Sequence, residues 1–579
     1  MKSAPIILNS CLKRYSLDLD KATTPEETVA NLERILASVD LDIVAEARRI
    51  DTGRLDIPVY ISVCGADARK ILPTRKQMGK GASPAQAKAS ALMELMERYA
   101  FFSFWENPRG AARATWSEAE ALFGADLVSI EEILKSVHDP LSPEKAREIM
   151  DLTSWLFYPA TNLRSGKIKW IPLDWFRMLG EFNGSSAGNA PEESLLQGVS
   201  ELIERHVCCI VDRESPRTPA IDPESVKTPV LRGLLDKFEK QGVKLVLKDF
   251  SMGMPLPTVG ALAWDPATFP ETSEIVFTAG TASSPEKAAI RAVTEIAQLA
   301  GDFHTGACYE ASGLPKFESL EECAWLLEGA SINIDELPSV ENDDIREELR
   351  AALEKLRIAD VYAVETTNPA LGVSAHWCVA PGLRFRERDR NESLGLFVGR
   401  KLAESEDASK ARAGLEVLNA YYPGAHFVRF FAGLVALNEG QDAASLFMEA
   451  YPAQPDADSR ALAAFYAAYS FTRKDQWDLA IPWLRKATVD SPRSKDYWNL
   501  LGAALYRTKD YASAEECFNK ALKIDKGSAI DLANRGVCRL ILGREEEARE
   551  DLRNALSLDP SLDFARTRLE ELNRRDHES

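Results

Sequence analysis

Apolar and polar positions follow two different patterns along this chain, with a change near residue 400. Before it, runs typical of β-strands alternate with stretches that have the period of a helix. Five runs predict strands: residues 57–65, 243–250, 274–280, 361–367 and 373–381. Four stretches predict helices: residues 81–98, 188–205, 282–299 and 344–356. This alternation predicts an α/β or α+β domain over residues 1–400.

From about residue 404 the pattern is helical throughout and repeats every 34 residues. Small or large apolar residues recur at this spacing in three consecutive units. They are Ala468, Gly502 and Gly536; Ala480, Ala514 and Ala548; Leu484, Phe518 and Leu552; and Ala487, Ala521 and Ala555. The unit resembles the tetratricopeptide consensus, in which each repeat is a helix pair and neighbouring repeats share a core. We therefore expect an all-α tetratricopeptide-like solenoid over residues 401–579.

A second repeat lies in the first domain, where one helix-start pattern is written three times. The segments are GASPAQAKASALMELMER from Gly81, GNAPEESLLQGVSELIER from Gly188 and ASSPEKAAIRAVTEIAQL from Ala282. They align without a gap, and each has a proline where it suits the first turn of a helix. Each then carries a polar residue, a Glu four residues later and a Glu or Gln three residues after that, on one helix face. The triplets are Ser90, Glu94 and Glu97; Gln197, Glu201 and Glu204; and Arg291, Glu295 and Gln298.

The acids of these helices border a surface rich in Ala, Leu, Ile, Val and Met. Carboxylates in such surroundings are costly unless a metal or another cation compensates them. A single motif of this kind is more typical of a solvated helix face, but three aligned copies favour a shared site. Small residues before the helices, as around Lys80, would let backbone N–H groups approach phosphate. The five acids therefore predict a magnesium-phosphate site, although the chain has no P-loop and no dinucleotide-binding glycine motif.

Composition narrows the classes of function. The 579 residues are 45% hydrophobic and 27% charged, which is ordinary for a globular protein of two or more domains. No apolar run approaches the length of a membrane span. The net charge of −19 argues against a basic surface for nucleic acid. Nine scattered cysteines without a CxxC pair favour reduced thiols. We expect a cytoplasmic protein with no membrane and no nucleic-acid partner.

The three motif segments resemble those of the YcaO family of ATP-dependent peptide-modifying enzymes. The matching stretches are GKGASPAQAKASALMELMER, NGSSAGNAPEESLLQGVSELIER and RAVTEIAQ, with a late segment from Val364 to Leu383. The resemblance covers about residues 1–395, and it implies the family's ATP site, which is built from these helices rather than from a P-loop. The C-terminal repeats place the chain beside family members that carry a helical-repeat region.

The resemblance also implies cofactors and roles for individual residues. It implies ATP and Mg²⁺, with more than one ion, and these metal ligands: Glu94, Glu97, Glu201, Glu204 and Glu295. It implies phosphate or neighbouring contacts from Ser186, Asn189, Gln197, Arg205 and Arg291. Glu193 falls where the family contacts the nucleoside, and Lys21 and Thr28 match a lysine and a serine, seven residues apart, near the family's N-terminus. Lys80 and Ser90 are further ATP-binding candidates from their places in the first motif. No catalytic base can be named.

Membership implies a reaction in which ATP phosphorylates a backbone amide oxygen of a peptide or protein and leaves as ADP. A nucleophile then adds to the amide carbon and phosphate departs. A side-chain thiol or hydroxyl gives an azoline ring, as in cyclodehydration, and sulfide gives a thioamide.

Two alternatives to this reaction stay open. The chain resembles a subgroup linked to methylthiolation of a ribosomal protein by a separate radical enzyme, so it is a candidate accessory factor. A scaffold with a vestigial nucleotide site is the other alternative. Under each hypothesis the repeats are expected to dock a partner protein, or else to cap the catalytic domain or mediate dimer contacts, and homodimers are common in the family.

Overall fold

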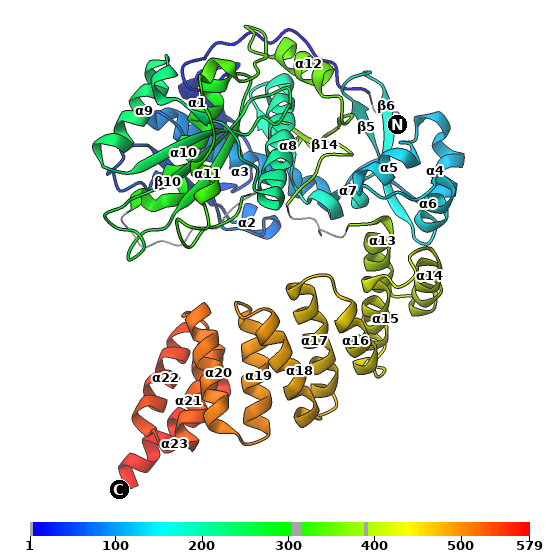
Figure 1. Ribbon diagram of the computed structural model, residues 1–579, viewed down its shortest axis with the longest axis vertical. Coiled ribbons are helices and arrows are strands. Elements are labelled where there is room, and N and C mark those ends of the chain that lie inside the picture. Colours follow the sequence, from blue (N-terminus) through cyan, green and yellow to red (C-terminus); the bar gives the residue numbers. More distant parts are fainter. Residues whose placement is uncertain (1–3, 304–313, 387–391, 579) are drawn as a thin grey trace. The chain divides into compact units, whose positions relative to one another are not determined.

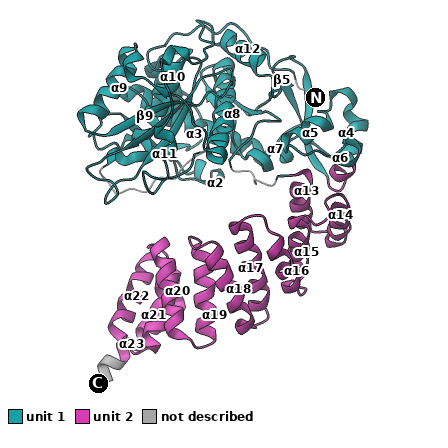
Figure 2. Cartoon of the chain, viewed as in Figure 1, with its two compact units in different colours: residues 1–147, 154–392 teal, residues 148–153, 393–579 magenta. Residues whose placement is uncertain are grey.

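The computed structural model describes residues 4–303, 314–386 and 392–578, with side chains as far as residue 574. These residues form two compact units (Figure 1, Figure 2). Unit 1 comprises residues 1–147 and 154–392, and unit 2 comprises residues 148–153 and 393–579. Unit 1 mixes strands and helices, whereas the described part of unit 2 is helical. The expected fold class, a mixed domain followed by an all-α repeat domain, is confirmed.

The strands described in unit 1 form three sheets. The first has the order β1 (Val44–Arg49), β2 (Val59–Cys64), β3 (Lys76–Lys80). The second has the order β11 (Val276–Thr281), β10 (Thr258–Trp264), β9 (Lys244–Asp249), β8 (Ala220–Ile221), β12 (Ser331–Ile332). The third has the order β4 (Ala112–Ala114), β5 (Trp155–Asn162), β13 (Tyr362–Glu365), β14 (Ser374–Val379), β7 (Ser185–Gly188), with β6 (Ile168–Pro172) beside β5. The five expected strands are β2, β9, β11, β13 and β14.

The three motif helices are α3 (Pro84–Glu106), α8 (Pro191–Glu214) and α10 (Pro285–Ala300), and each begins at its aligned proline. Each follows an edge strand of a different sheet: β3, β7 or β11. Each also packs on the strand that it follows and on the next strand of that sheet. Three strand–turn–helix units therefore bring the three acidic helix faces together, since α3, α8 and α10 all contribute residues to one cavity.

Close contacts between strand and helix fix the position of each motif helix on its sheet. We call this packing position the seat of the helix. A Cβ atom on Gly79 of β3 would lie 2.0 Å from the backbone nitrogen of Ala91 on α3. A Cβ atom on Gly280 of β11 would lie 2.5 Å from the carbonyl oxygen of Ala288 on α10. In the remaining unit the glycine is on the helix, since a Cβ atom on Gly198 would lie 2.9 Å from a backbone oxygen just before β7. Backbone therefore packs on backbone in all three units.

Further helices surround the sheets of unit 1. They are α1 (Pro25–Ser38), α2 (Ala68–Ile71), α4 (Trp116–Phe123), α5 (Ile130–Ser136), α6 (Pro143–Met150), α7 (Leu173–Gly180), α9 (Pro229–Lys240), α11 (Ala324–Leu327) and α12 (Ile345–Lys355). The expected helix over residues 344–356 is α12, which packs against α8. Short 3₁₀ turns at 124–126, 223–225, 301–303 and 334–336 complete the secondary structure of this unit.

Unit 2 consists of successive helices joined by short turns. They are α13 (Leu394–Ala403), α14 (Ala408–Tyr421), α15 (His426–Asn438), α16 (Ala444–Ala450), α17 (Ala457–Thr472), α18 (Trp477–Asp490), α19 (Lys495–Arg507), α20 (Tyr511–Ile524), α21 (Ala529–Ile541), α22 (Glu545–Leu558) and α23 (Asp563–Glu578). The repeated small position is where paired helices meet: a Cβ atom on Gly502 would lie 2.8 Å from the ring of Phe518. The 34-residue period therefore reports helix pairs packed in one register.

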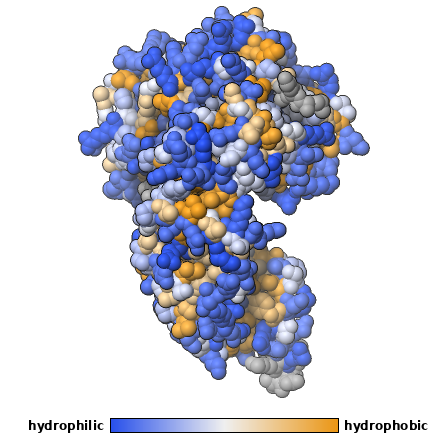
Figure 3. All heavy atoms as spheres, turned by 90° about the vertical axis from the view of Figure 1, so that its right-hand side faces the viewer, coloured by the Kyte–Doolittle hydropathy of each residue, from blue (hydrophilic) through white to orange (hydrophobic). Residues whose placement is uncertain are grey.

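The visible surface is mostly hydrophilic (Figure 3). Figure 3 shows hydrophilic residues over most of the visible face, with hydrophobic ones in small groups on both units. None of the helices in the described part of the chain is both long enough and apolar enough to cross a membrane.

Candidate functional site

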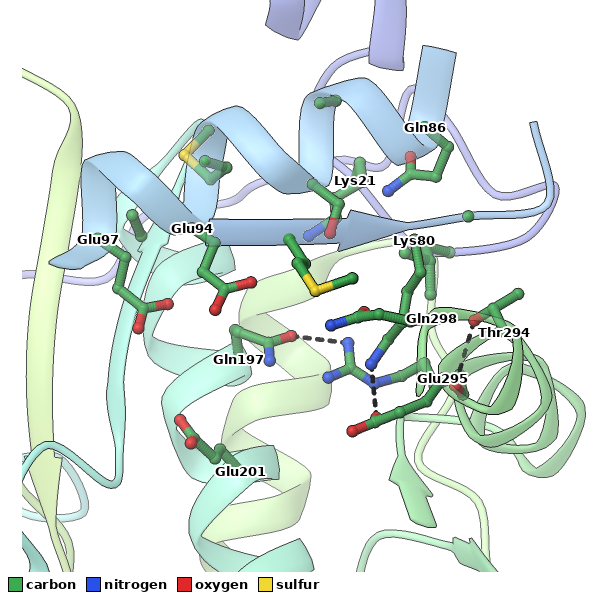
Figure 4. Close-up of a pocket in the computed structure, with 18 of the residues that line it drawn as sticks. Lys21, Lys80, Gln86, Glu94, Glu97, Gln197, Glu201, Thr294, Glu295 and Gln298 are labelled. Carbon is green, nitrogen blue, oxygen red and sulfur yellow. Dashed lines mark hydrogen bonds and ion pairs between the residues drawn. The ribbon is translucent and has the colours of Figure 1, made fainter. Parts of the chain in front are cut away.

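Residues of α3, α8 and α10 line a cavity of about 500 Å³ in unit 1 (Figure 4). Strand β3, the segment before α1, the first turn of α1 and the stretch around β7 also contribute to its lining. All of the residues predicted from the sequence, except Ser186, line this cavity. They are Lys21, Thr28, Lys80, Ser90, Glu94, Glu97, Asn189, Glu193, Gln197, Glu201, Glu204, Arg205, Arg291 and Glu295. Three sequence segments that are some 100 residues apart thus contribute to one site.

Ser186 lies outside the cavity lining and is buried in β7. Its hydroxyl donates a hydrogen bond to the carbonyl oxygen of Ser194 at 2.7 Å. It occupies the strand position that Gly79 and Gly280 hold in the other two units, opposite Gly198. A small residue is therefore required here for packing, which accounts for Ser186 without a phosphate contact.

The cavity holds seven carboxylates and five cationic side chains. Three of the cations are paired with predicted metal ligands. Lys80 Nζ lies 2.5 Å from Glu295 Oε2. Arg98 lies 3.2 Å from Glu97, and Arg205 lies 3.7 Å from Glu201. The protein's own cations thus compensate the acids partly, as buried charges require.

Two arginines have donors without partners. The Nε atoms of Arg205 and Arg291 are buried and make no hydrogen bond. One terminal nitrogen of Arg291 donates to Gln197 Oε1 at 3.0 Å, which leaves the rest of the guanidinium for a ligand. An unsatisfied buried donor is unfavourable, and an anion with several oxygens would satisfy both arginines.

The surroundings of these acids shift their pKa values in different directions. Burial raises the pKa of Glu97 to about 8 and that of Glu204 to about 7, and neighbouring carboxylates contribute to both shifts. Burial likewise raises the pKa of Glu94. Burial acts in the same direction on Glu295, but Lys80 together with Arg205 and Arg291 outweighs it, so the pKa of Glu295 is lowered. At neutral pH the ligand-free site therefore holds protons on some acids.

One end of the cavity is built on Glu193, in the first turn of α8. Lys21 Nζ lies 3.3 Å from its carboxylate, and the Ala22 N–H donates to it at 2.9 Å. The side-chain amide of Asn189 also donates to Glu193, at 3.1 Å, and Thr28 donates to the Asn189 oxygen at 3.1 Å. Lys21 and Thr28, which match the lysine and serine near the family's N-terminus, therefore belong to one hydrogen-bonded cluster around Glu193.

The structure adds cavity residues that the sequence analysis did not select. Arg98 contacts Glu97 and stacks 4.2 Å from the centroid of the Phe182 ring. Its signal was present, because Arg98 aligns with Arg205 in the motif. Asp18 also lines the cavity, and its carboxylate accepts from the Ala82 N–H at 3.1 Å. No repeat or spacing marks Asp18 in the sequence.

The donor set of the cavity fits Mg²⁺ and phosphate. Mg²⁺ takes oxygen ligands and often shares them between carboxylates and substrate phosphates. The cavity offers carboxylate oxygens from three helices and two arginines with unpartnered nitrogens. Across the described ranges, no three His, Cys, Asp or Glu side chains are close enough to hold a metal ion by themselves. Phosphate oxygens would supply the missing ligands, so the site fits a metal–nucleotide complex better than a free ion.

The chain belongs to the YcaO family. Residues 78–384 match the family model described as YcaO cyclodehydratase, ATP- and Mg²⁺-binding. Unit 1 is therefore a YcaO cyclodehydratase-type domain that binds ATP and Mg²⁺. Residues 495–528 and 532–562 match tetratricopeptide-repeat models, which confirms the repeat character of the C-terminal region.

Relatives in curated collections extend over different shares of the chain. An uncharacterized protein of Methanothermobacter thermautotrophicus is 27% identical over 407 residues, which cover 66% of this chain and 99% of that protein. The ribosomal protein S12 methylthiotransferase accessory factor YcaO of Escherichia coli is 27% identical over 207 residues, covering 33% of this chain and 35% of that protein.

A solved structure supports the fold. The heterocyclase in complex with substrate and cofactor has a TM-score of 0.52 and 21% identity, covering 66% of this chain and 55% of that chain. This chain thus spans about half of that heterocyclase, and at this identity the likeness concerns the fold alone.

Proposed function

We propose that this protein uses Mg-ATP to activate a backbone amide of a peptide or protein for nucleophilic addition. The observation that carries the proposal is the convergence of five glutamates from α3, α8 and α10 beside Arg205 and Arg291, whose buried Nε atoms lack partners. Membership of a family described as an ATP- and Mg²⁺-binding cyclodehydratase supports it.

The residues divide into a phosphate end and a nucleoside end. Glu94, Glu97, Glu201, Glu204 and Glu295 would hold Mg²⁺, which screens the triphosphate charge when bound. Arg205 and Arg291 would bind phosphate oxygens in forked geometry, and Gln197 would orient Arg291. The remaining candidates, Lys21, Thr28, Lys80, Ser90, Asn189 and Glu193, would surround the rest of the nucleotide.

The reaction is a phosphoryl transfer followed by an addition. The amide oxygen forms a bond to the γ-phosphorus while the bond to the ADP oxygen breaks. A thiol, hydroxyl or sulfide then adds to the amide carbon, and phosphate departs with the former amide oxygen. The chain's contribution is positioning and charge stabilisation, for which the fixed seats of the three helices are suited.

An accessory role in methylthiolation of a ribosomal protein is the second candidate. The Escherichia coli accessory factor matches 207 residues of this chain, and tetratricopeptide repeats usually bind partner proteins. Under this proposal the repeats dock the modifying enzyme or its substrate, and ATP use serves the partner's reaction.

A proteome-wide mass comparison between the source organism and a strain without this gene distinguishes amide activation from the accessory role. If the protein activates an amide, one backbone site should lack its modification in the strain without the gene. The missing modification is either a sulfur in place of the amide oxygen or a ring formed by loss of water. The accessory role predicts loss of a side-chain methylthio group instead. Unchanged proteomes, in cells that express the protein, would contradict both.

Proton release should accompany Mg-ATP binding. The raised pKa values of Glu97, about 8, and Glu204, about 7, mean that these acids hold protons in the ligand-free protein at pH 7. Metal binding needs the carboxylates, so the protons leave, and affinity should fall as the pH drops from 8 to about 6. Isothermal titration at pH 7 in two buffers of different ionisation enthalpy measures the release. Identical heats in both buffers would contradict this prediction.

A further inference from the structure

Residues 15–21 form a short closed loop beside the cavity, which we call the clamp loop. Backbone hydrogen bonds join its ends: the N–H of Lys21 donates to the Tyr15 oxygen at 2.9 Å, and the N–H of Tyr15 donates to the Lys21 oxygen at 3.2 Å. Asp18, Leu19 and Lys21 of this loop line the cavity. The clamp loop is therefore part of the cavity wall and has a defined backbone conformation.

The clamp loop and the residue after it contact the beginning of all three motif helices. Asp18 accepts from the N–H of Ala82, just before α3, at 3.1 Å. Lys21 and the N–H of Ala22 both contact Glu193 in the first turn of α8. Asp20 forms an ion pair with Lys287 in the first turn of α10. One segment thus connects three helix starts that come from distant parts of the sequence.

Asp20 is the centre of a buried chain of charges. Besides Lys287, it pairs with Lys13 at 3.0 Å, and Lys13 pairs with Glu348 of α12 at 2.6 Å. The side chains of Asp20 and Lys287 are 8% and 10% exposed. Removing such charges from water offsets most of their attraction, so a buried pair contributes little to stability. Its better attested effect is to fix one arrangement of the chain.

We propose that the Asp20–Lys287 pair is a positioning device that sets the affinity for the nucleoside part of the nucleotide. This inference rests on the proposed function. Lys287 precedes Arg291 by one helical turn on α10, and Asp20 precedes Lys21 directly. The pair therefore holds Lys21 and Glu193 at a fixed place relative to the phosphate-binding residues. Those residues lie deeper along the helices, on seats that do not involve the clamp loop.

Lys287→Met tests the pair without leaving a buried carboxylate unpaired. Asp20 keeps Lys13 as a partner, and Glu341, the other partner of Lys287, is half exposed. Isothermal titration of the full chain compares two probes, a non-hydrolysable Mg-ATP analogue and Mg²⁺ with inorganic triphosphate. We expect K287M to bind the nucleotide analogue about tenfold more weakly than the wild type and the triphosphate less than about twofold more weakly. Only the positioning of the nucleoside end is lost. Lys287→Arg should bind both probes like the wild type.

Arg54→Met is the matched control. Arg54 pairs with Asp265 at 2.8 Å with side chains 15% and 2% exposed, and neither residue lines the cavity. R54M should lose stability without changing either affinity. Equal losses for both probes in K287M, or no loss for either, would overturn the proposal.

Hydrogen exchange separates failure of this proposal from failure of the proposed function. Without nucleotide, K287M should exchange the Ala22 and Ala82 amides faster than the wild type. The Ala82 amide donates to Asp18 of the clamp loop, and the Ala22 amide, directly after the loop, donates to Glu193. If protection of these two amides in K287M is unchanged, the proposed role of the Asp20–Lys287 pair is overturned, whether or not nucleotide binds. A wild-type chain that binds neither probe contradicts the proposed function instead.

Discussion

Glu204→Gln should lower Mg²⁺-dependent ATP turnover by about 100-fold or more while the chain stays folded. Loss of one charged group from a preorganised phosphoryl-transfer site has effects of this order. Glutamine keeps the oxygen that accepts from the N–H of Thr281 at 2.9 Å, so the local packing remains. Turnover is measured as phosphate release at saturating peptide substrate, or as the intrinsic ATPase rate when the substrate is unknown.

The same variant should be more stable than the wild type when no ligand is bound. Burial raises the pKa of Glu204 from 4.5 to about 7, so its folded state binds the proton more tightly than its unfolded state. Stability therefore falls as the pH rises from about 4.5 to about 7. E204Q removes this loss and should raise the melting temperature at pH 8 but not at pH 4. The exposed Glu131→Gln is the control and should change neither activity nor stability. Full turnover by E204Q would contradict the metal-ligand assignment.

Gly79→Ala should destabilise unit 1 by about 3 kcal/mol or more, because the clash is with backbone rather than with a movable side chain. The new Cβ atom would lie 2.0 Å from the nitrogen of Ala91 and 2.5 Å from the oxygen of Ala87. Helix α3 would have to leave its seat, and Glu94 and Glu97 would move with it. Chemical denaturation of the full chain measures the loss, and Mg-ATP binding should be lost with it.

Gly233→Ala is the control for this glycine. Gly233 lies within α9, and no atom lies within 4 Å of an added Cβ. Alanine favours a helix interior by up to about 1 kcal/mol over glycine, so G233A should be neutral or stabilising. If G79A is as stable as G233A, the strand–helix seat does not determine the position of α3.

Much of the fold could be predicted because local pattern and tertiary structure agree. The aligned prolines mark the true helix starts at Pro84, Pro191 and Pro285. The 34-residue period gives the helix pairs of unit 2, since it depends only on neighbouring contacts. Strand β7, by contrast, reads SSAG and has no alternating pattern. It is a strand because β14 pairs with it, which no local signal reveals.

The cavity residues show the same division. The motif alignment located the acids, and it contained Arg98 as the counterpart of Arg205. The family resemblance led to Ser186, whose small side chain is required by packing against Gly198. Apart from Lys21, which the family resemblance selected, the clamp loop has no signal in the sequence, because its contacts join residues such as Asp20 and Lys287 that are 267 positions apart.

The central claim is that α3, α8 and α10 form one Mg-ATP site. A crystal structure of the full chain with Mn²⁺ in place of Mg²⁺ and a non-hydrolysable ATP analogue tests it most directly. Anomalous scattering locates the metal ions. We predict metal peaks between the glutamates of these helices and the phosphates, with Arg205 and Arg291 on phosphate oxygens. Nucleotide bound elsewhere, or metal away from these carboxylates, would contradict the claim.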